Sequence, residues 1–428
     1  MGLNWQASGI EGRKALLVEL LEVAIDAADA GQTMAEALPP KPRGRTVVVG
    51  AGKASARMAQ AFERAWGDPV EGLVVTRYGH AMETASIEIV EAAHPVPDAA
   101  GLAAAARMLK LVRGLTADDL VIALISGGGS ALLPAPFDGL TLEDEQAASR
   151  VLLASGLSID KMNRIRNELS AIKGGRLAAA AYPARVCTLI VSDITGDDPA
   201  LVASGPTIPM QTSREEVRRL IALHELALPD AVKALIGSDR NLPPQPDDPH
   251  FARNEVHIVA SAARSLDAAA YAAAGIGLST HILSDSIEGE ARDVAGVLAA
   301  IAKEVQAKRR PFAPPALLLS GGETTVTVRG KGRGGRNAEF LLAFAIAIDG
   351  QNGIAAIAAD TDGIDGTEEN AGAYADGASV SRMRAAGVDP RQALGNNDAW
   401  SAFAAIDGLI VTGPTGTNVN DFRAILVQ

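Results

Sequence analysis

Short, almost wholly apolar runs that alternate with helix-like stretches are the feature that most constrains the fold of this chain. TVVVG at residues 46–50 and LVIALIS at residues 120–126 are two such runs, and glycines follow both. Helix-like stretches at residues 54–66 and 98–112 lie between runs of this kind. Short buried strands that alternate with helices are typical of a parallel sheet with helices on both faces. We therefore expect an α/β protein whose first half is a doubly wound, Rossmann-like parallel sheet.

The length of 428 residues exceeds what one core usually supports, so we expect two domains. The segment GSDRNLPPQPDDPHFARN at residues 237–254 has four prolines and no apolar periodicity, which is typical of a linker. We place an N-terminal domain at residues 1–240, the linker at 241–254 and a smaller, mixed α/β C-terminal domain at 255–428. Apolar residues at helical spacing within the first 30 residues predict an amphipathic helix that packs against a domain.

The charge balance and the single cysteine narrow the class of protein. Lys and Arg number 39 against 51 Asp and Glu, and a net charge of −12 argues against binding to nucleic acid or anionic membranes. No run reaches the ~18 apolar residues of a membrane span, and charged residues interrupt any signal-peptide pattern at the N-terminus. Cys187 rules out an intramolecular disulfide and is expected to be a buried, inert thiol. These features indicate a cytoplasmic protein. The six histidines show no metal-ligand spacing, and we expect His94 to be structural.

The first glycine-rich turn, VVVGAGKAS at residues 47–55, joins a strand to a helix. Gly50 and Gly52 would let the backbone approach a phosphate at the helix N-terminus, and Lys53 would add a positive charge. The turn lacks the Walker A spacing, and Ser55 replaces the third glycine of a dinucleotide fingerprint. Arg77 after the next strand disfavours NAD but would suit NADP. A plain tight turn with Lys53 in solvent is the alternative.

Two further loops follow strands in the first half. SGGGS at residues 126–130 combines three glycines at a strand end, where ligands bind in open α/β sheets. SDITGDDPALVASGPT at residues 192–207 begins with Asp193, whose carboxylate could bind Mg²⁺ or cap a turn, and ends in a small, donor-rich loop.

The second half has a comparable set of motifs: SGGETT at residues 320–325, RNAE at 336–339, ADTDG at 359–363 and TGTNVND at 415–421. Arg336 opens a predicted helix, where its guanidinium could bind a carboxylate or a phosphate with two hydrogen bonds. Asp360 and Asp362 end a predicted strand. The other basic residues of the glycine-rich segment 329–336 fit a solvated hairpin tip.

Taken in order, these motifs make the chain resemble the class II glycerate kinases, whose C-terminal half is the MOFRL domain. VVVGAGKAS, HPVPD, SGGGSALL, SDITGDD, SGPT, SGGETTV, GGRNAEF, ADTDGIDG and TGTNVND occur in the order of that family. The resemblance extends from about residue 44 to the end of the chain. It implies two α/β domains with an active site in the cleft between them, and phosphorylation of D-glycerate at its 2-hydroxyl by ATP with Mg²⁺ or another divalent cation.

The resemblance gives Lys53 and Arg336 the essential positive roles, and alanine at either position is expected to lower turnover by orders of magnitude without unfolding the protein. Asp193 and Asp360 are the expected metal ligands, by residue type and position. The remaining residues expected to bind nucleotide or substrate are Gly50, Gly52, Ser126, Gly127, Gly128, Gly129, Ser130, Ser204, Gly205, Thr207, Gly321, Gly322, Glu323, Thr324, Asn337, Glu339, Asp362 and Asn418.

Two other functions remain open from the sequence. Members of this family have also been labelled hydroxypyruvate reductases, and the partial dinucleotide turn with Arg77 would suit NAD(P)H. A sensor that binds a nucleotide or sugar phosphate without turnover is the third interpretation. A homodimer is compatible with the sequence.

Overall fold

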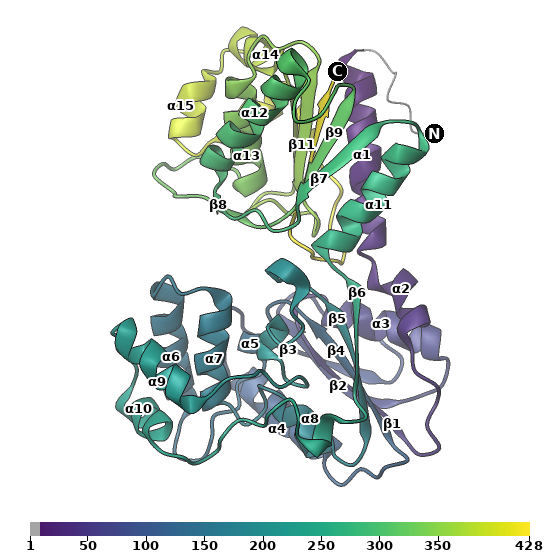
Figure 1. The fold of residues 1–428 in the computed structure, drawn as a ribbon, viewed down its shortest axis with the longest axis vertical. Coiled ribbons are helices and arrows are strands. Elements are labelled where there is room, and N and C mark those ends of the chain that lie inside the picture. Colours follow the sequence, from purple (N-terminus) through teal and green to yellow (C-terminus); the bar gives the residue numbers. More distant parts are fainter. Residues whose placement is uncertain (1–8) are drawn as a thin grey trace. The chain divides into compact units, whose positions relative to one another are not determined.

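Six strands form the sheet of the first half, in the order β3-β2-β1-β4-β5-β6 (Figure 1). The computed structural model describes residues 9–428. The strands are β1 (Thr46–Ala51), β2 (Glu71–Arg77), β3 (Ile87–Ala92), β4 (Leu120–Ser126), β5 (Arg185–Val191) and β6 (Glu255–Ala260). Strands β1 to β5 pair in parallel. Every residue of β4 is buried, as its unbroken apolar run requires. The predicted doubly wound, Rossmann-like sheet is confirmed.

Helices cover both faces of this sheet. On one face the apolar residues of α4 (Ala99–Val112) and α8 (Arg176–Ala181) share a core with β1, β4 and β5. On the other, α3 (Ser55–Trp66) contacts β2 and β4, and α2 (Ala30–Ala37) contacts β5. Four more helices build a separate apolar cluster beside the sheet: α6 (Leu142–Ala154), α7 (Ile159–Leu169), α9 (Arg214–Leu223) and α10 (Asp230–Gly237). The one-turn helix α5 (Gly129–Leu132) follows β4.

A second six-stranded sheet, in the order β13-β12-β11-β14-β9-β7, organises the other half. Its strands are β7 (Ser279–Ser284), β9 (Ala316–Ser320), β11 (Ile354–Asp360), β12 (Gly372–Asp376), β13 (Leu409–Ile410) and β14 (Asp421–Val427). β7 and β9 are parallel and the other pairs are antiparallel, so this domain is mixed as predicted. A separate short pair joins β8 (Gly289–Glu290) to β10 (Thr324–Thr325).

Two layers of helices bury this second sheet. α12 (Ala291–Lys308) and α13 (Arg336–Ala347) share one core with it, together with α14 (Ser379–Ala385) and α16 (Ala399–Ala404). α15 (Pro390–Gly395) packs beside α13. The opposite face is covered by α11 (Ala262–Gly275) and by α1 (Ile10–Ala27), which comes from the start of the chain. Figure 1 shows α1 in purple beside α11 and the strands of this unit.

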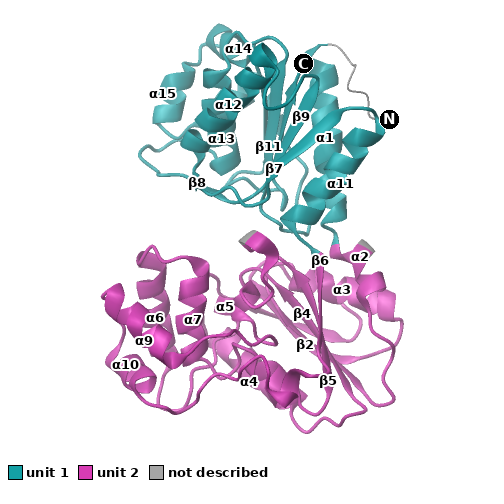
Figure 2. Ribbon diagram, in the orientation of Figure 1, with its two compact units in different colours: residues 1–29, 260–428 teal, residues 30–259 magenta. Residues whose placement is uncertain are grey.

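The boundaries of the two units differ from the predicted domains. Ala30–Val259 form one unit, called here the N-terminal unit, and the described residues up to Asp29 join Ala260–Gln428 in the C-terminal unit (Figure 2). The first helix crosses to the C-terminal unit because Leu17, Leu20 and Leu21 are fully buried against its sheet.

The predicted linker, residues 241–254, belongs to the N-terminal unit. Phe251 packs against the core of the first sheet. β6 was predicted to open the second domain but completes the first sheet, so the chain passes between the units near residue 260.

Among residues 9–428, no helix combines the length with the apolar character that a membrane crossing requires.

Candidate functional site

The carboxyl ends of β1 and β4 lie side by side at the point where the strand order of the first sheet reverses. The glycine turns that follow these strands are joined, since the Lys53 N–H donates to the Gly127 carbonyl (2.9 Å) and the Ala54 N–H to Ser126 Oγ (3.0 Å). Open α/β sheets bind ligands outside their carboxyl ends at such a reversal. The structure therefore brings together the first two glycine motifs of the sequence.

The two turns approach each other too closely for side chains. A Cβ atom on Gly52, which has a φ of +143°, would lie 2.1 Å from Ser126 Oγ. A Cβ atom on Gly127 would lie 1.7 Å from Asp193 Oδ2. Gly52 therefore requires glycine, whereas a Cβ at Gly127 would have to displace the Asp193 carboxylate, which lies directly against the second turn, as expected at the end of β5.

Positive side chains gather around His94 at the same place. A Cβ atom on Gly128 would lie 3.1 Å from His94 Nε2 and 3.2 Å from Lys53 Cγ, so both residues flank the second turn. Burial, and then the charges of Lys53, Arg77 and Arg166, lowers the pKa of His94 to about 4. His94 is therefore neutral at pH 7 and stands within a cationic cluster, although the sequence favoured a purely structural histidine.

Two fully buried cations of the unit have carboxylate partners, unlike the partly buried Lys53 and Arg166 of this cluster. Lys173 is paired with Glu145 (2.6 Å) and Arg214 with Glu168 (2.5 Å). Within residues 9–428, neither Lys53 nor Arg166 has a carboxylate oxygen within 4.0 Å. Burying a charge without an opposite charge is costly, so an anionic ligand would be favoured here.

The SGPT loop joins this cluster through its serine. Ser204 Oγ lies 2.8 Å from Ser130 Oγ and donates to Asn163 Oδ1 (2.9 Å). Its φ of +62° is unusual for a residue with a side chain. Thr207 is buried and bonds to Thr188 (2.8 Å), which indicates that it supports the loop instead of binding a ligand.

In the C-terminal unit, three carboxylates hold Arg336. Its Nε bonds to Asp421 (2.7 Å), Nη1 to Glu323 (2.6 Å) and Nη2 to Asp360 (2.7 Å). These bonds use three of the five N–H groups of the guanidinium, which leaves one on Nη1 and one on Nη2 for the predicted two-bond grip on a ligand. Glu323 is the most accessible, with 55% of its side chain exposed against 9% for Asp360 and 0% for Asp421.

Acids outnumber bases around Arg336. Burial lowers its pKa, but Asp421, Asp360 and Glu323 outweigh this and raise it. Burial, and then the charge of Asp362, raises the pKa of Asp360 well above its ordinary value, although Arg336 opposes the shift. The surplus of negative charge is compatible with the expected metal role of Asp360.

The first turn of α13 depends on buried acids. Asp365 accepts hydrogen bonds from the N–H groups of Asn337 (2.9 Å) and Ala338 (2.8 Å). Burial raises the pKa of Asp365 to about 6, although these two hydrogen bonds favour the charged form and oppose the shift. The Asn337 side chain donates to Asp421 (2.8 Å), so it belongs to the Arg336 cluster. This end of α13 is fixed by hydrogen bonds from within the unit.

Glu339, which we predicted to bind a ligand, is held by hydrogen bonds within the C-terminal unit. Its side chain is buried and accepts hydrogen bonds from Arg292 (3.0 Å) and Asn397 (2.8 Å). Because these hydrogen bonds satisfy its carboxylate within the protein, Glu339 is suited to hold α13 in place.

The SGGET loop and the last polar motif complete the cluster. The N–H of Thr324 donates to Asp421 Oδ2 (3.2 Å), and that of Asp362 to Asp360 Oδ1 (3.1 Å). Asn418 accepts from the N–H of Asn420 (3.1 Å), so it shapes its own turn.

The predicted residues thus fall into two groups. The N-terminal unit holds Gly50, Gly52, Lys53, Ser126, Gly127, Gly128, Gly129, Ser130, Asp193, Ser204, Gly205 and Thr207. The C-terminal unit holds Gly321, Gly322, Glu323, Thr324, Arg336, Asn337, Glu339, Asp360, Asp362 and Asn418.

One group of three potential metal ligands, which no spacing in the sequence indicated, converges among the described residues. Ligand atoms of Cys187, Glu255 and His257 all lie within 4.8 Å of one another. Burial raises the thiol pKa to about 12, and Arg185 already bonds to Glu255 (3.0 Å). These features favour the inert thiol that the sequence predicted.

The sequence missed Arg166, Asn163, Asp421 and Arg423 as members of these clusters. Arg166 and Asn163 lie on α7, where polar residues are unremarkable, and only the fold brings them to the loops. Asp421 closes the TGTNVND motif, which was a usable signal, whereas buried Arg423 lies in a strand and bonds to Asp421.

Comparisons with known proteins agree over nearly the whole length. A model named "Domain of unknown function (DUF4147)" matches residues 16–237, and the MOFRL family model matches residues 316–421. The D-glycerate 2-kinase of Thermotoga maritima is 39% identical over 413 residues, which cover 96% of this chain and 97% of that protein. A "putative hydroxypyruvate reductase" of Agrobacterium vitis is 50% identical over 415 residues, with coverage of 96% and 94%.

Solved structures give the same result. The crystal structure of glycerate kinase from Thermotoga maritima matches with a TM-score of 0.90 and 38% identity, covering 98% of this chain and 100% of that one. The PH0495 protein from Pyrococcus horikoshii matches with a TM-score of 0.82 and 32% identity, covering 99% of this chain and 100% of the other.

Proposed function

Because this chain belongs to the class II glycerate kinase family with its MOFRL domain, we propose that it phosphorylates D-glycerate at the 2-hydroxyl with ATP, giving 2-phosphoglycerate and ADP. The observation that carries the proposal is Lys53, a cation without a carboxylate partner among residues 9–428, beside two glycine turns at the reversal point of the sheet. The Thermotoga maritima relative is named for this activity.

The chemistry needs positive charge and positioning more than an elaborate base. Negative charge spreads over the transferred phosphoryl group, and fixed donors stabilise it. Lys53 would supply a full charge, while the N–H groups at the start of α3 would supply a helix dipole. Arg336 would add a second charge through the N–H groups of Nη1 and Nη2 that its three carboxylate partners leave over.

A divalent cation is part of the proposal. Carboxylate oxygens are the ligands that Mg²⁺ prefers, and the residues present fit this requirement. Asp193 lies against Gly127 in the N-terminal unit, and Asp360 lies in the acid-rich cluster of the C-terminal unit. We propose Asp193 and Asp360 as metal ligands, each considered within its own unit. A bound divalent cation would neutralise phosphate charge.

The test is product analysis by phosphorus NMR after incubation with MgATP and D-glycerate. A 2-phosphoglycerate signal that is absent without enzyme supports the proposal and its regiochemistry. A 3-phosphoglycerate signal refutes the assignment of the 2-hydroxyl. Activity that persists after chelation of divalent cations with EDTA refutes the metal requirement.

A second function, NAD(P)H-dependent reduction of hydroxypyruvate, has one observation in its favour. Two Agrobacterium vitis relatives at 50% and 52% identity carry that name. Arg77 ends β2, where an arginine can bind the 2′-phosphate of NADP, but it already bonds to His80 (2.6 Å). Oxidation of NADPH in the presence of hydroxypyruvate, without any phosphoglycerate from the kinase assay, would establish this function instead.

A further inference from the structure

Arg166, near the end of α7, is a second partly buried cation of the cluster around His94 that has no carboxylate partner among the described residues. Only one hydrogen bond holds it, from Nη1 to Asn163 Oδ1 (3.1 Å), and no carboxylate of the described chain lies within 4.0 Å. Its Nε and Nη2 therefore keep their N–H groups for another partner. These two nitrogens form one edge of the guanidinium fork, which matches the two oxygens of a carboxylate.

A hydrogen-bonded chain connects Arg166 to the second glycine turn. Asn163 accepts from both Arg166 and Ser204, and Ser204 bonds to Ser130. Arg166 and Ser130 also line the same cavity, a space of about 20 Å³ that Pro95, Pro97, Glu145 and Lys173 help to enclose. The cation is therefore fixed in position relative to the loop where the substrate is proposed to bind.

The other charges of this cavity cancel. Lys173 and Glu145 form an ion pair at 2.6 Å, and both are almost fully buried. Arg166 is left as the uncompensated charge. Burial lowers its pKa, with Glu145 acting in the opposite direction, so the guanidinium is desolvated and would gain from an anionic partner.

Arg166 comes from a different element of the fold than the groups suited to phosphate. Lys53 and the start of α3 belong to the glycine turn after β1, whereas Arg166 comes from α7 of the separate helical cluster. Two different positive groups are thus available for two different anions, and a kinase acting on a hydroxy acid must bind both a phosphate chain and a carboxylate.

We propose that Arg166, through its Nε and Nη2, binds the carboxylate of the acceptor substrate and so restricts the enzyme to hydroxy acids over neutral polyols. This inference rests on the proposed function for the identity of the acceptor. Asn163 and Ser204 are positioning residues that hold Arg166 toward the loop.

The test compares the KM values of Arg166→Gln and Arg166→Lys for D-glycerate and ATP with those of the unmodified enzyme. Arg166→Gln should raise the KM for D-glycerate about 10- to 100-fold, as for loss of a charged hydrogen-bonded pair, with the KM for ATP within about twofold. Arg166→Lys should recover part of the loss. Arg164→Gln is the matched control, because Arg164 is on the same helix and bonds to Gln211 and Thr212.

A neutral substrate analogue separates carboxylate binding from a general defect. Glyceramide replaces the carboxylate by an amide, so the unmodified enzyme should use it poorly and Arg166→Gln should change its kcat/KM little. Arg166→Gln that raises the KM for ATP alone would assign Arg166 to phosphate and overturn the proposal. Unchanged KM values for both substrates in Arg166→Gln and Arg166→Lys would also overturn it.

The experiment distinguishes this inference from the proposed function. If the unmodified protein forms no phosphoglycerate but reduces hydroxypyruvate, the kinase function fails. Hydroxypyruvate also carries a carboxylate, so Arg166→Gln should then raise the KM for hydroxypyruvate and leave that for NADPH unchanged. Isothermal titration with D-glycerate gives the same comparison at equilibrium. A general loss of stability in Arg166→Gln would lower its thermal midpoint but would not selectively weaken the binding of D-glycerate.

Discussion

Replacing Arg336 by alanine should cost the C-terminal unit roughly 3–5 kcal/mol of stability, the range for removing one partner of a buried ion pair. The side chain is 22% exposed and neutralises Asp421, Asp360 and Glu323, two of which are almost fully buried. Without it, carboxylates that repel one another would remain in a desolvated cluster. Domains of 150–250 residues lose about 2–4 °C of midpoint per kcal/mol, so the thermal midpoint should fall by about 6–20 °C.

Differential scanning calorimetry at pH 7.5 measures this loss. Arg384→Ala is the control, because Arg384 belongs to the same unit but forms an exposed ion pair with Asp349 (3.3 Å), which contributes less than about 1 kcal/mol. The deficit of Arg336→Ala should shrink toward pH 4–5, because unpaired acids have raised pKa values in the folded state and their protonation removes the repulsion. A midpoint within 2 °C of the unmodified protein at pH 7.5 would refute this account of the cluster.

Further predictions concern the N-terminal unit. Lys53→Ala should lower phosphoryl transfer by about 100-fold or more while shifting the thermal midpoint little, because its ammonium has no carboxylate partner among residues 9–428; a steady-state assay with calorimetry checks both. Gly127→Ala should lower both activity and stability, because the new Cβ would press on Asp193, and the same two measurements test it. Cys187, with its pKa near 12, should react with iodoacetamide at pH 8 far more slowly in the folded protein than in urea; equal rates would contradict its burial. Since the fold lowers the pKa of His94 to about 4 from an ordinary value near 6.5, the unfolded chain takes up the proton first, so this residue should reduce stability as the pH falls from about 6.5 to 4. Urea unfolding of His94→Gln should show a weaker pH dependence in that window.

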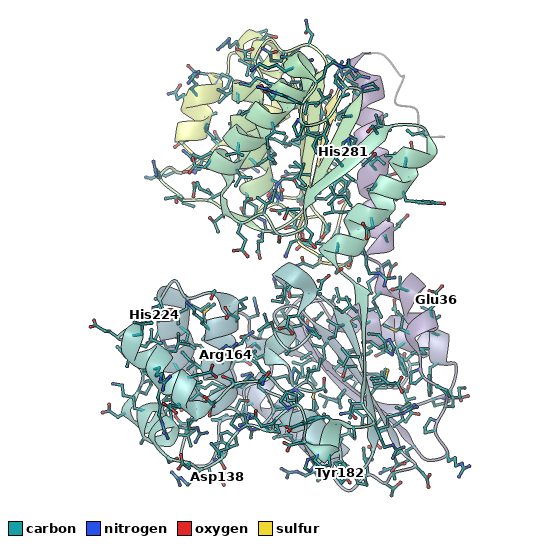
Figure 3. All side chains as sticks on the ribbon, in the orientation of Figure 1. Glu36, Asp138, Arg164, Tyr182, His224 and His281 are labelled. Carbon is teal, nitrogen blue, oxygen red and sulfur yellow. The ribbon has the colours of Figure 1, made fainter. Side chains whose placement is uncertain are left out.

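The strands and their order of appearance followed from local pattern. The run 120–126 became β4 with every residue buried, and residues 87–92 became β3. The sheet to which each strand belongs could not be predicted, because a local apolar pattern does not specify which strand pairs with it. β6 resembles the start of a second domain in the sequence and pairs instead with β5. The side chains that fill the structure are drawn in Figure 3.

Site prediction met the same limit. Glycines such as Gly52 can be identified from a sequence, because the close approach of two loops excludes every other residue. Arg166 cannot be identified from the sequence, because tertiary structure determines which residues are its partners. Its significance is that it has no carboxylate partner among the described residues. Glu339 shows the converse, since a motif position that suggested a ligand contact is satisfied by Arg292 and Asn397.

The placement of α1 has a consequence for biosynthesis. α1 is synthesised before every other described element, yet its leucines cover a sheet that includes the last strand, β14. The N-terminal unit, Ala30–Val259, is contiguous and can fold while synthesis continues. The apolar face of α1 must therefore stay unpartnered, and open to chaperones, until β14 has been synthesised.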